Sequence, residues 1–267
     1  YTVDDKWIVP HFEKMLYDNI LFIKLLNSFV GNTKNEYFKS KLIQSINFIN
    51  KEFKNKDGLL GSAYDADSEG IEGKYYIWKY KDFENLLGEN LELFKKKYEI
   101  SESGNFEGSN ILIEKSQFTL NDKELIVLKN LENILINERS KRVKPFFDDK
   151  SQTDLNAFIL DTLISSSIVL EDNNLKNEAI NTLEILNNKL SNKIYHCYDS
   201  TEIDAFLEDY VYYAMLLVTL YEVDGDENSL QKAITIMKEI WEIFYNKDIQ
   251  LLQKNKIKDN DLFVNPI

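Results

Sequence analysis

IDAFLEDYVYYAMLLVTLYEVDGDENSLQKAITIMKEIWEIF, residues 203–244, contains the pattern that predicts the fold. Residues 203–223 are apolar around the whole circumference of a helix, and Asp224-Gly225-Asp226 then predicts a turn. In residues 230–244 apolar side chains recur every three or four positions among charged ones. A helix that is apolar on all sides is expected to be enclosed, whereas a striped helix is half-exposed. The stretch therefore predicts an inner helix, a tight turn and an outer helix.

The same succession occurs twice more, in residues 12–53 and in residues 154–190. Repeated antiparallel helical pairs form either a solenoid or a closed α/α toroid. Solenoid repeats have fixed periods of about 34 to 47 residues, but the inner helices here begin near 12, 154 and 203. This spacing favours a mainly all-α fold of the α/α toroid type, a single domain over 1–267 with elaborated loops.

The longest interruption, residues 57–120, is an insertion with different chemistry. Its glycine-rich and acidic stretches predict turns and short strands, including a β-hairpin, and a short helix is expected at Tyr80–Leu87. SGNFEGSNILIE, residues 103–114, predicts a further turn and strand. A helix at about 121–139 should follow the insertion.

Composition excludes several classes of partner. The net charge of −13 would repel nucleic acid and an anionic membrane surface alike. The most apolar run, residues 210–221, is too short for a bilayer span. Cys197 is the chain's one cysteine, which excludes an internal disulfide and a Cys-x-x-Cys pair. We therefore expect a cytoplasmic protein without nucleic-acid or membrane partners, although the first residue is Tyr1 and a leader would not be seen.

Charged residues gather at the predicted start of each inner helix. Because inner helices of a toroid begin at one end of its funnel, we expect these groups to converge on a common cavity. They are His11, Glu13 and Lys14 with Trp7 and Asp18; Asp148, Asp149, Lys150, Asp154 and Asn156; and Asp204, Glu208 and Asp209.

Structural interpretations account for several of these groups. Asp154 and Asp204 suit helix caps, because an acidic side chain there accepts from free N–H groups. Lys14 and Asp18 have the i,i+4 spacing of a helical ion pair. His196 lies beside Cys197 with no metal-ligand spacing around it, which indicates an ordinary turn and no metal site.

The acidic stretch DADSEG, residues 65–70, places Asp65, Asp67 and Glu69 as in the first half of a calcium-binding loop. Position 12 of such a loop would be Tyr76, which has no carboxylate, and the flanks are predicted strands. A network with Lys74, or an acidic loop that covers a pocket, is favoured over a cation site.

Four motifs carry a family resemblance. WIVPHFEKMLYDN (7–19), DADSEGIEGKYYIW (65–78), GNFEGSNIL (104–112) and PFFDDK (145–150) resemble, in that order, the thioredoxin-domain-containing proteins related to spermatogenesis-associated protein. The resemblance covers about residues 1–160 and extends more loosely over residues 207–233. One departure is Leu155, where family members usually have Trp before the residue matched by Asn156.

The resemblance implies a thioredoxin-like domain followed by an α/α toroid similar to N-acylglucosamine 2-epimerase and the six-hairpin glycosidases. This chain would begin after the thioredoxin-like part and would stop before the last helical pairs of a closed ring, so we expect an incomplete toroid. The resemblance also implies a sugar-like ligand and a possible thioredoxin-like partner, domain or chain. No cofactor is implied.

Three functions remain open beside a purely structural network. An epimerase would use His11 with Glu13 or Glu208 as acid and base. A glycoside hydrolase would pair Asp148 or Asp149 with Asp209. A non-catalytic module would hold a ligand for a thioredoxin-like domain. The predicted catalytic residues are His11, Glu13, Asp148, Asp149, Glu208 and Asp209, and the predicted ligand-binding residues are Trp7, Lys14, Asp18, Asp65, Asp67, Glu69, Lys150, Asn156 and Tyr210.

Overall fold

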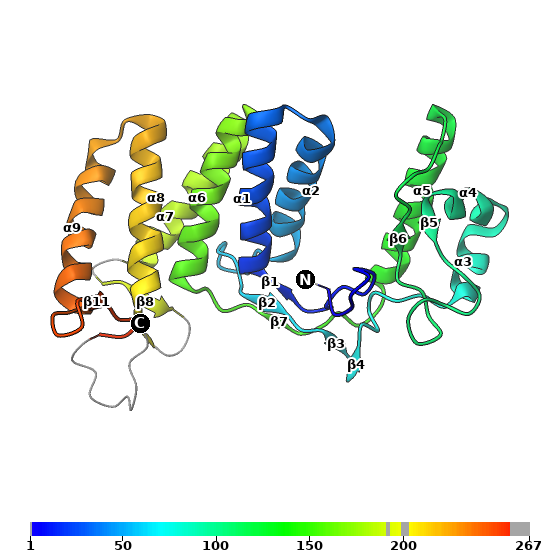
Figure 1. Cartoon of the computed structure of the whole chain (residues 1–267), viewed down its shortest axis with the longest axis horizontal. Coiled ribbons are helices and arrows are strands. Elements are labelled where there is room, and N and C mark those ends of the chain that lie inside the picture. Colours follow the sequence, from blue (N-terminus) through cyan, green and yellow to red (C-terminus); the bar gives the residue numbers. More distant parts are fainter. Residues whose placement is uncertain (1, 191–192, 199–202, 257–267) are drawn as a thin grey trace. The chain divides into compact units, whose positions relative to one another are not determined.

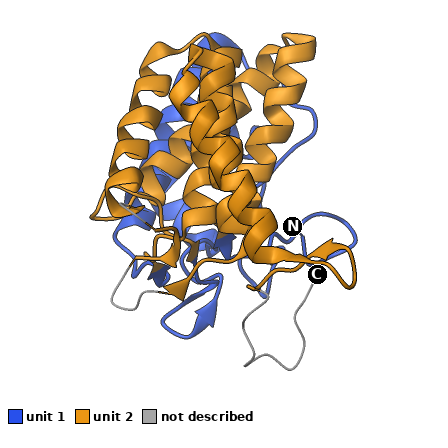
Figure 2. Cartoon of the chain, turned by 90° about the vertical axis from the view of Figure 1, so that its left-hand side faces the viewer, with its two compact units in different colours: residues 1–14, 64–147 blue, residues 15–63, 148–267 orange. Residues whose placement is uncertain are grey.

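The computed structural model describes residues 2–190, 193–198 and 203–256, and the chain divides into two compact units (Figure 2). Residues 1–14 and 64–147 form one, here called the small unit, and residues 15–63 and 148–267 form the other, the helical unit. The predicted insertion, 57–120, thus falls mostly in the small unit, together with residues 1–14 and 121–147. A single domain over 1–267 stays a prediction.

The helical unit is built from three antiparallel helical pairs (Figure 1). Among the inner helices, α6 packs against both α1 and α8, and each inner helix packs against the outer helix that follows it. The three predicted pairs are confirmed. They are α1 (Leu16–Thr33) with α2 (Glu36–Glu52), α6 (Thr153–Leu170) with α7 (Asn173–Leu190), and α8 (Leu207–Asp224) with α9 (Glu227–Phe244).

Local chemistry makes the turns within the pairs tight. Gly225 adopts a left-handed conformation, φ 69°, and its N–H donates to the carbonyl of Tyr221 at 2.8 Å, which ends α8. The carboxylate of Asp226 then accepts from the backbone N–H of Asn228 and caps α9. Asn35 caps α2 in the same way.

Two inner helices begin later than predicted. α1 begins at Leu16 instead of near 12, because Lys14–Met15 forms strand β1 and the Leu16 N–H donates to the carbonyl of Ser62. α8 begins at Leu207 instead of 203, because Ile203–Asp204 (β9) pairs with Tyr195–Cys197 (β8). The charged groups therefore lie largely in the segments that precede the helices. β1 belongs to a three-stranded sheet of order β1-β2-β7, with β2 at Ala63–Tyr64 and β7 at Phe147–Asp148.

Enclosure differs between the inner helices. Most of α6 is buried, and it is the one helix of the described residues whose length and composition would allow it to cross a membrane; its packing against α1, α7 and α8 is that of a core helix. α1 departs from the prediction that it is enclosed, since Leu21, Phe22 and Leu25 are each about half exposed. The apolar pattern was correct, but neighbours cover just one face of this helix.

The small unit has its own core, where α3, α4 and α5 meet. α3 (Tyr80–Leu87) matches the predicted bounds, and α5 (Asp122–Ser140) confirms the helix expected at about 121–139. The 3-10 helix η1 (Gly88–Asn90) and α4 (Leu91–Lys97) lie between them in sequence. The core residues are Trp78, Phe83, Leu87, Leu91, Phe94, Leu128, Leu131 and Leu135.

The described residues also form short two-stranded antiparallel sheets. β3 (Asp67–Ser68) pairs with β4 (Ile71–Glu72) around the acidic loop, which confirms a β-hairpin in the insertion. β5 (Tyr98–Glu99) pairs with β6 (Ile113–Glu114), and β10 (Tyr245–Asn246) pairs with β11 (Leu251–Leu252) after α9.

Candidate functional site

Asp209 lies in the first turn of α8 and is completely buried. One of its carboxylate oxygens accepts from the backbone N–H of Phe206 at 2.8 Å, as in a capping box. The other accepts from the backbone N–H of Asp154 at 3.0 Å, in the first turn of α6. A buried carboxylate needs such donors. Asp209 therefore joins the beginnings of two inner helices.

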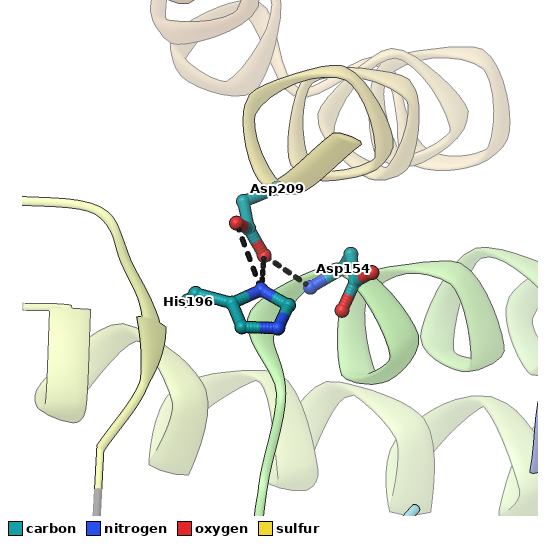
Figure 3. A group of neighbouring side chains, drawn as sticks. All are labelled: Asp154, His196 and Asp209. Atoms are coloured by element: carbon teal, nitrogen blue, oxygen red, sulfur yellow. Dashed lines mark hydrogen bonds and ion pairs between the residues drawn. The ribbon is translucent and has the colours of Figure 1, made fainter. Parts of the chain in front are cut away.

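His196, on β8, is the third group bonded to this carboxylate. Its Nδ1 lies 3.1 Å from both oxygens of Asp209 (Figure 3). Because an ionised carboxylate can only accept, Nδ1 carries the proton, and Nε2 is left for another partner. The hydrogen bond to Asp209 raises the pKa of His196 above its usual value, against the opposing effect of burial. The side chain is 16% exposed, so it is not completely enclosed.

Asp154 provides a second ionisable group beside the imidazole (Figure 3). Burial raises the pKa of its carboxyl group, and repulsion from Asp209 raises it further. Donor atoms of Asp154, His196 and Asp209 can be chosen that all lie within 4.8 Å of one another. Two groups with raised pKa values thus stand next to a buried carboxylate, an arrangement suited to proton transfer.

The same three side chains have the composition of a metal site. A cation held by Asp209 would have to displace a backbone N–H or the imidazole proton, because both oxygens already accept these hydrogens. Metal-bound carboxylates and imidazoles use those lone pairs for the ion. The hydrogen bonding therefore fits a His–Asp proton-transfer pair better than a metal centre.

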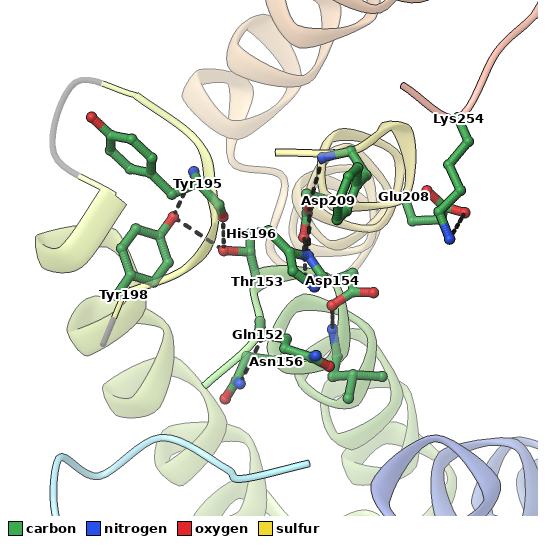
Figure 4. Close-up of polar contacts among 12 residues, drawn as sticks. Gln152, Thr153, Asp154, Asn156, Tyr195, His196, Tyr198, Glu208, Asp209 and Lys254 are labelled. Atoms are coloured by element: carbon green, nitrogen blue, oxygen red, sulfur yellow. Dashed lines mark hydrogen bonds and ion pairs between the residues drawn. The ribbon is translucent and has the colours of Figure 1, made fainter. Parts of the chain in front are cut away.

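The strand that carries His196 is held against the beginning of α6. The hydroxyl of Thr153 donates to the carbonyl of Tyr195 at 2.5 Å, and the Tyr195 N–H donates to the hydroxyl of Tyr198 at 3.1 Å (Figure 4). The ring of Phe206 meets the imidazole edge-on at 4.8 Å between centroids. These contacts fix the orientation of the imidazole before any ligand binds.

Two further groups lie beside Asp154. Glu208 has one oxygen 3.6 Å from the ammonium of Lys254 (Figure 4), and its other oxygen, Oε2, is buried with no hydrogen-bond partner among the described residues. Tyr212 stacks on Phe158 at 4.3 Å, and burial, followed by the charges of Asp154 and Glu208, raises its pKa. A free acceptor and an aromatic ring are features that bind hydroxylated ligands.

The predicted residues of the helical unit separate into different roles. Glu208 and Asp209 belong to the cluster just described. Asn156 is fully buried, and its amide donates to and accepts from the backbone of Leu60, which is a structural role; its predicted ligand binding stays a prediction. Tyr210 is 5% exposed and packs on Phe244, which places it in the core.

Asp148, Asp149 and Lys150 lie together just before α6. Asp148 accepts from the Lys150 ammonium at 3.1 Å, and the carbonyl of Asp149 accepts from Asn55 at 2.9 Å. Their side chains are partly or largely exposed. Asp18 lies in the first turn of α1, where it accepts from Tyr17 and raises the pKa of that phenol. The predicted catalytic use of Asp148 and Asp149 stays a prediction.

Four of the predicted catalytic and ligand-binding residues lie in residues 1–14 of the small unit. Trp7 is 81% exposed. The backbone N–H of Glu13 donates to Nδ1 of His11 at 3.2 Å, and the Lys14 ammonium lies 3.3 Å from the centroid of the Tyr76 ring. The predicted convergence of His11 with Asp149 and Asp209 stays a prediction.

The acidic loop of the small unit forms the network with Lys74 that the sequence favoured. Glu69 lies 2.8 Å from the Lys74 ammonium, and Asp65 accepts from the backbone N–H of Asp67 at 3.3 Å. The carboxylates of Asp65 and Asp67 are on exposed residues. Glu69 itself adopts a left-handed turn conformation, φ 55°.

His196 and Asp154 were not among the predicted functional residues. The interpretation of residues 196 and 197 as a turn is wrong, because both lie in strand β8 (Tyr195–Cys197), which pairs with β9. Asp154 lies inside α6 and Asp204 lies in β9, so neither is the predicted helix N-cap. One feature of the sequence could have indicated His196. It is one of the two histidines of the chain, and Asp209 lies 13 residues after it.

Comparison with known proteins places this geometry in context. No family model matches the chain. Human spermatogenesis-associated protein 20 is 25% identical over 92% of this chain and 37% of its own length. An uncharacterized Caenorhabditis elegans protein is 24% identical over 89% of this chain and 39% of its own. The chain thus spans less than half the length of these relatives, and the similarity supports the toroid part of the resemblance.

A solved structure supports the same conclusion about fold. Cellobiose 2-epimerase from Spirochaeta thermophila superposes with a TM-score of 0.51 at 8% identity, covering 88% of this chain and 45% of that one. At this identity the likeness concerns the fold alone. The chain has a mainly helical fold of the α/α toroid type seen in sugar epimerases.

Proposed function

We propose that His196, Asp209 and Asp154 form a general acid–base centre that acts on a sugar-like small molecule, in a reaction of the isomerase or epimerase class. The observation that carries the proposal is an imidazole, on a side chain that is 16% exposed, held through Nδ1 by a fully buried carboxylate. In such a pair the carboxylate orients the ring and stabilises the imidazolium that forms during proton transfer.

The chemistry follows from the two raised pKa values. Nε2 of neutral His196 would take the proton from the carbon next to an open-chain carbonyl, and the negative charge of Asp209 would stabilise the imidazolium. Asp154 stays protonated to a higher pH than an ordinary aspartate. It would donate its proton to the carbonyl oxygen to form an enediol. His196 would then return the first proton to either carbon while a hydroxyl proton of the enediol goes back to Asp154, which restores a carbonyl and both acid–base groups.

The hydrolase alternative has weaker support. Glycoside hydrolysis needs one carboxylate as nucleophile or base and another as acid. Both oxygens of Asp209 are occupied by backbone N–H groups and the imidazole, so this carboxylate is not available to attack a substrate or a water. The likeness of fold to an enzyme named cellobiose 2-epimerase supports proton transfer next to a carbonyl as the reaction class.

Solvent exchange tests the proposal directly. The full chain would be incubated with cellobiose and, separately, D-mannose in D2O, and loss of the C2 proton signal followed by NMR. We expect exchange by the wild-type chain and a loss of about 10²-fold in His196→Gln, the range for removal of an acid–base group. Asp204→Asn, an exposed acid on the neighbouring strand, is the matched control and should keep the wild-type rate.

Products separate the possible reactions. A ketose would indicate isomerisation, and a 2-epimer would indicate proton return to the opposite face of the enediol. Binding without exchange would favour the alternative of a non-catalytic module, to which the free acceptor Oε2 of Glu208 gives specific support. If the chain neither bound nor exchanged either sugar, the proposal would be overturned. A thioredoxin-like partner and a cytoplasmic location remain predictions.

A further inference from the structure

Both arginines of the chain lie at one corner of the small unit. The sequence has 32 lysines and arginines, of which only Arg139 and Arg142 are arginines. Arg139 is in the last turn of α5, and Arg142 follows that helix directly. A guanidinium makes paired hydrogen bonds to carboxylate and phosphate groups and stacks on aromatic rings, which an ammonium does not do. The chain uses lysine everywhere else, so this corner is chemically distinct.

Arg142 is held in place without a carboxylate partner among the described residues. Its Nη1 donates to the carbonyls of Ile77 at 2.7 Å and Tyr75 at 3.1 Å, and its guanidinium lies 3.9 Å from the centroid of the Trp78 ring. Burial has the largest effect on the pKa of Arg142 and lowers it. The negative charge of Asp82 raises this pKa, and repulsion from Arg139 lowers it further. A nearby anion would relieve both effects.

Arg139 has an unused donor. Its Nε is buried and has no hydrogen-bond partner among the described residues. The guanidinium lies 5.5 Å from the ring centroid of Tyr75. An unpaired buried donor on a charged group costs free energy. An acceptor bound at the Arg139 Nε would remove that cost.

A cavity of about 510 Å³ adjoins Arg142. Its other charged lining residues are Lys74, Lys79, Lys141, Glu69 and Asp82. Lys74 is neutralised by Glu69 at 2.8 Å, and Lys141 by Glu138 at 2.6 Å. Lys79 and Arg142 then outweigh Asp82, which leaves a positive cavity in a chain of net charge −13.

The cavity also has a neutral polar residue in its wall. Ser109 lines it and is 3% exposed. A structural role accounts for part of this arrangement. The basic groups offset the negative C-terminal end of the α5 dipole, and Arg142 donates to the backbone carbonyls of Tyr75 and Ile77. That role leaves the buried Arg139 Nε and the positively charged cavity unexplained.

We infer that this cavity binds the oxyanion of a small molecule, a phosphate or a carboxylate. Arg142 and Lys79 supply the positive charge, and the Ser109 hydroxyl supplies a neutral donor. The inference stands apart from the acid–base centre, because every group it uses belongs to the small unit.

Calorimetric titration of the full chain tests the inference. Inorganic phosphate and malonate would be titrated separately at constant ionic strength, with chloride as the reference anion. We expect saturable binding of at least one of the two, and its identity distinguishes a phosphate site from a carboxylate site. Lys79→Gln and Arg142→Lys should each weaken binding about tenfold, the effect of one charge-assisted hydrogen bond.

Lys129→Gln, an exposed lysine on α5, is the matched control and should bind as the wild type does. Circular dichroism of each variant checks folding. Should Arg142→Lys unfold, Lys79→Gln still decides the question, because the Lys79 ammonium contacts only the Gly108 carbonyl among the described residues. Absence of saturable binding for both anions, or unchanged affinity in the folded variants, would overturn the inference.

Discussion

Helices α1 and α6 have the same kind of sequence and different surroundings. Both are apolar on nearly every side. α6 lies between α1 and α8 and also packs on α7, and Ile159 and Leu160 on it are completely buried. α1 packs on α2 and α6, and on its other face Leu25 is 53% exposed. An apolar pattern thus states what a helix can bury, whereas its neighbours decide what it does bury.

The buried helix nevertheless carries a charge. Asp161, 4% exposed in the middle of α6, accepts from the Lys24 ammonium on α1 at 2.8 Å and from the Thr219 hydroxyl on α8 at 2.6 Å. These bonds satisfy the carboxylate and connect the three inner helices side by side. Burial of a charge is tolerated here because partners from both neighbours reach it.

Removal of a buried side chain from α6 should give the largest effect. Ile159→Ala is expected to lower the free energy of unfolding by about 3 kcal/mol, from lost burial and the cavity that remains. Urea denaturation monitored by circular dichroism measures this change. A loss below about 1 kcal/mol, the size expected for an average substitution, would contradict the enclosure of α6.

Loss of a partner of Asp161 should have a smaller effect. Lys24→Met keeps the apolar stem and leaves the carboxylate with the Thr219 hydroxyl alone, so we expect a cost of about 2 kcal/mol. Lys51→Met on the exposed surface of α2 is the control, with a change within about 0.5 kcal/mol. Equal unfolding midpoints for the two variants would show that Lys24 does not compensate the buried charge.

The His196–Asp209 pair should make the free energy of unfolding depend on pH. The apolar contacts of α1 and α6 carry no such dependence. The pKa of folded His196 is raised above 6.5 because Asp209 accepts from its ring. The stabilisation is therefore complete below about pH 6.5 and is lost as the pH rises through the folded pKa. Urea midpoints measured from pH 6 to 9 should fall in the wild type and in Asp204→Asn. In His196→Gln this decline should be absent; a persistent decline would point to another group.

Truncation on the exposed face of α1 should have the smallest effect. Leu25→Ala removes a side chain that is already half in solvent, so the free energy of unfolding should change by no more than about 0.5 kcal/mol. Together with Ile159→Ala, this variant measures the difference between two helices of similar composition. A cost near that of Ile159→Ala would show that the exposed face of α1 is covered in solution.

The sequence predicted helices better than it predicted their beginnings. The bounds of α3 and the pairing of inner with outer helices were recovered, because spacing of apolar residues and turn residues are local signals. The late starts of α1 and α8 depend on strand pairing and on the carbonyl of Ser62, which is distant in sequence from Leu16. The candidate site shows the same division, since Glu208 and Asp209 were named from their position at the start of a predicted helix, whereas His196 was not named.

By itself the sequence determined that this protein is mainly helical, acidic and built from inner and outer helical pairs, because helical periodicity and turn chemistry act over a few residues. Tertiary structure alone decided that α6 is enclosed and α1 is not. It also decided that Asp209 accepts from His196, 13 residues away, and from Asp154, 55 residues away. Such partners meet only when separate helices pack, so no local pattern reveals them.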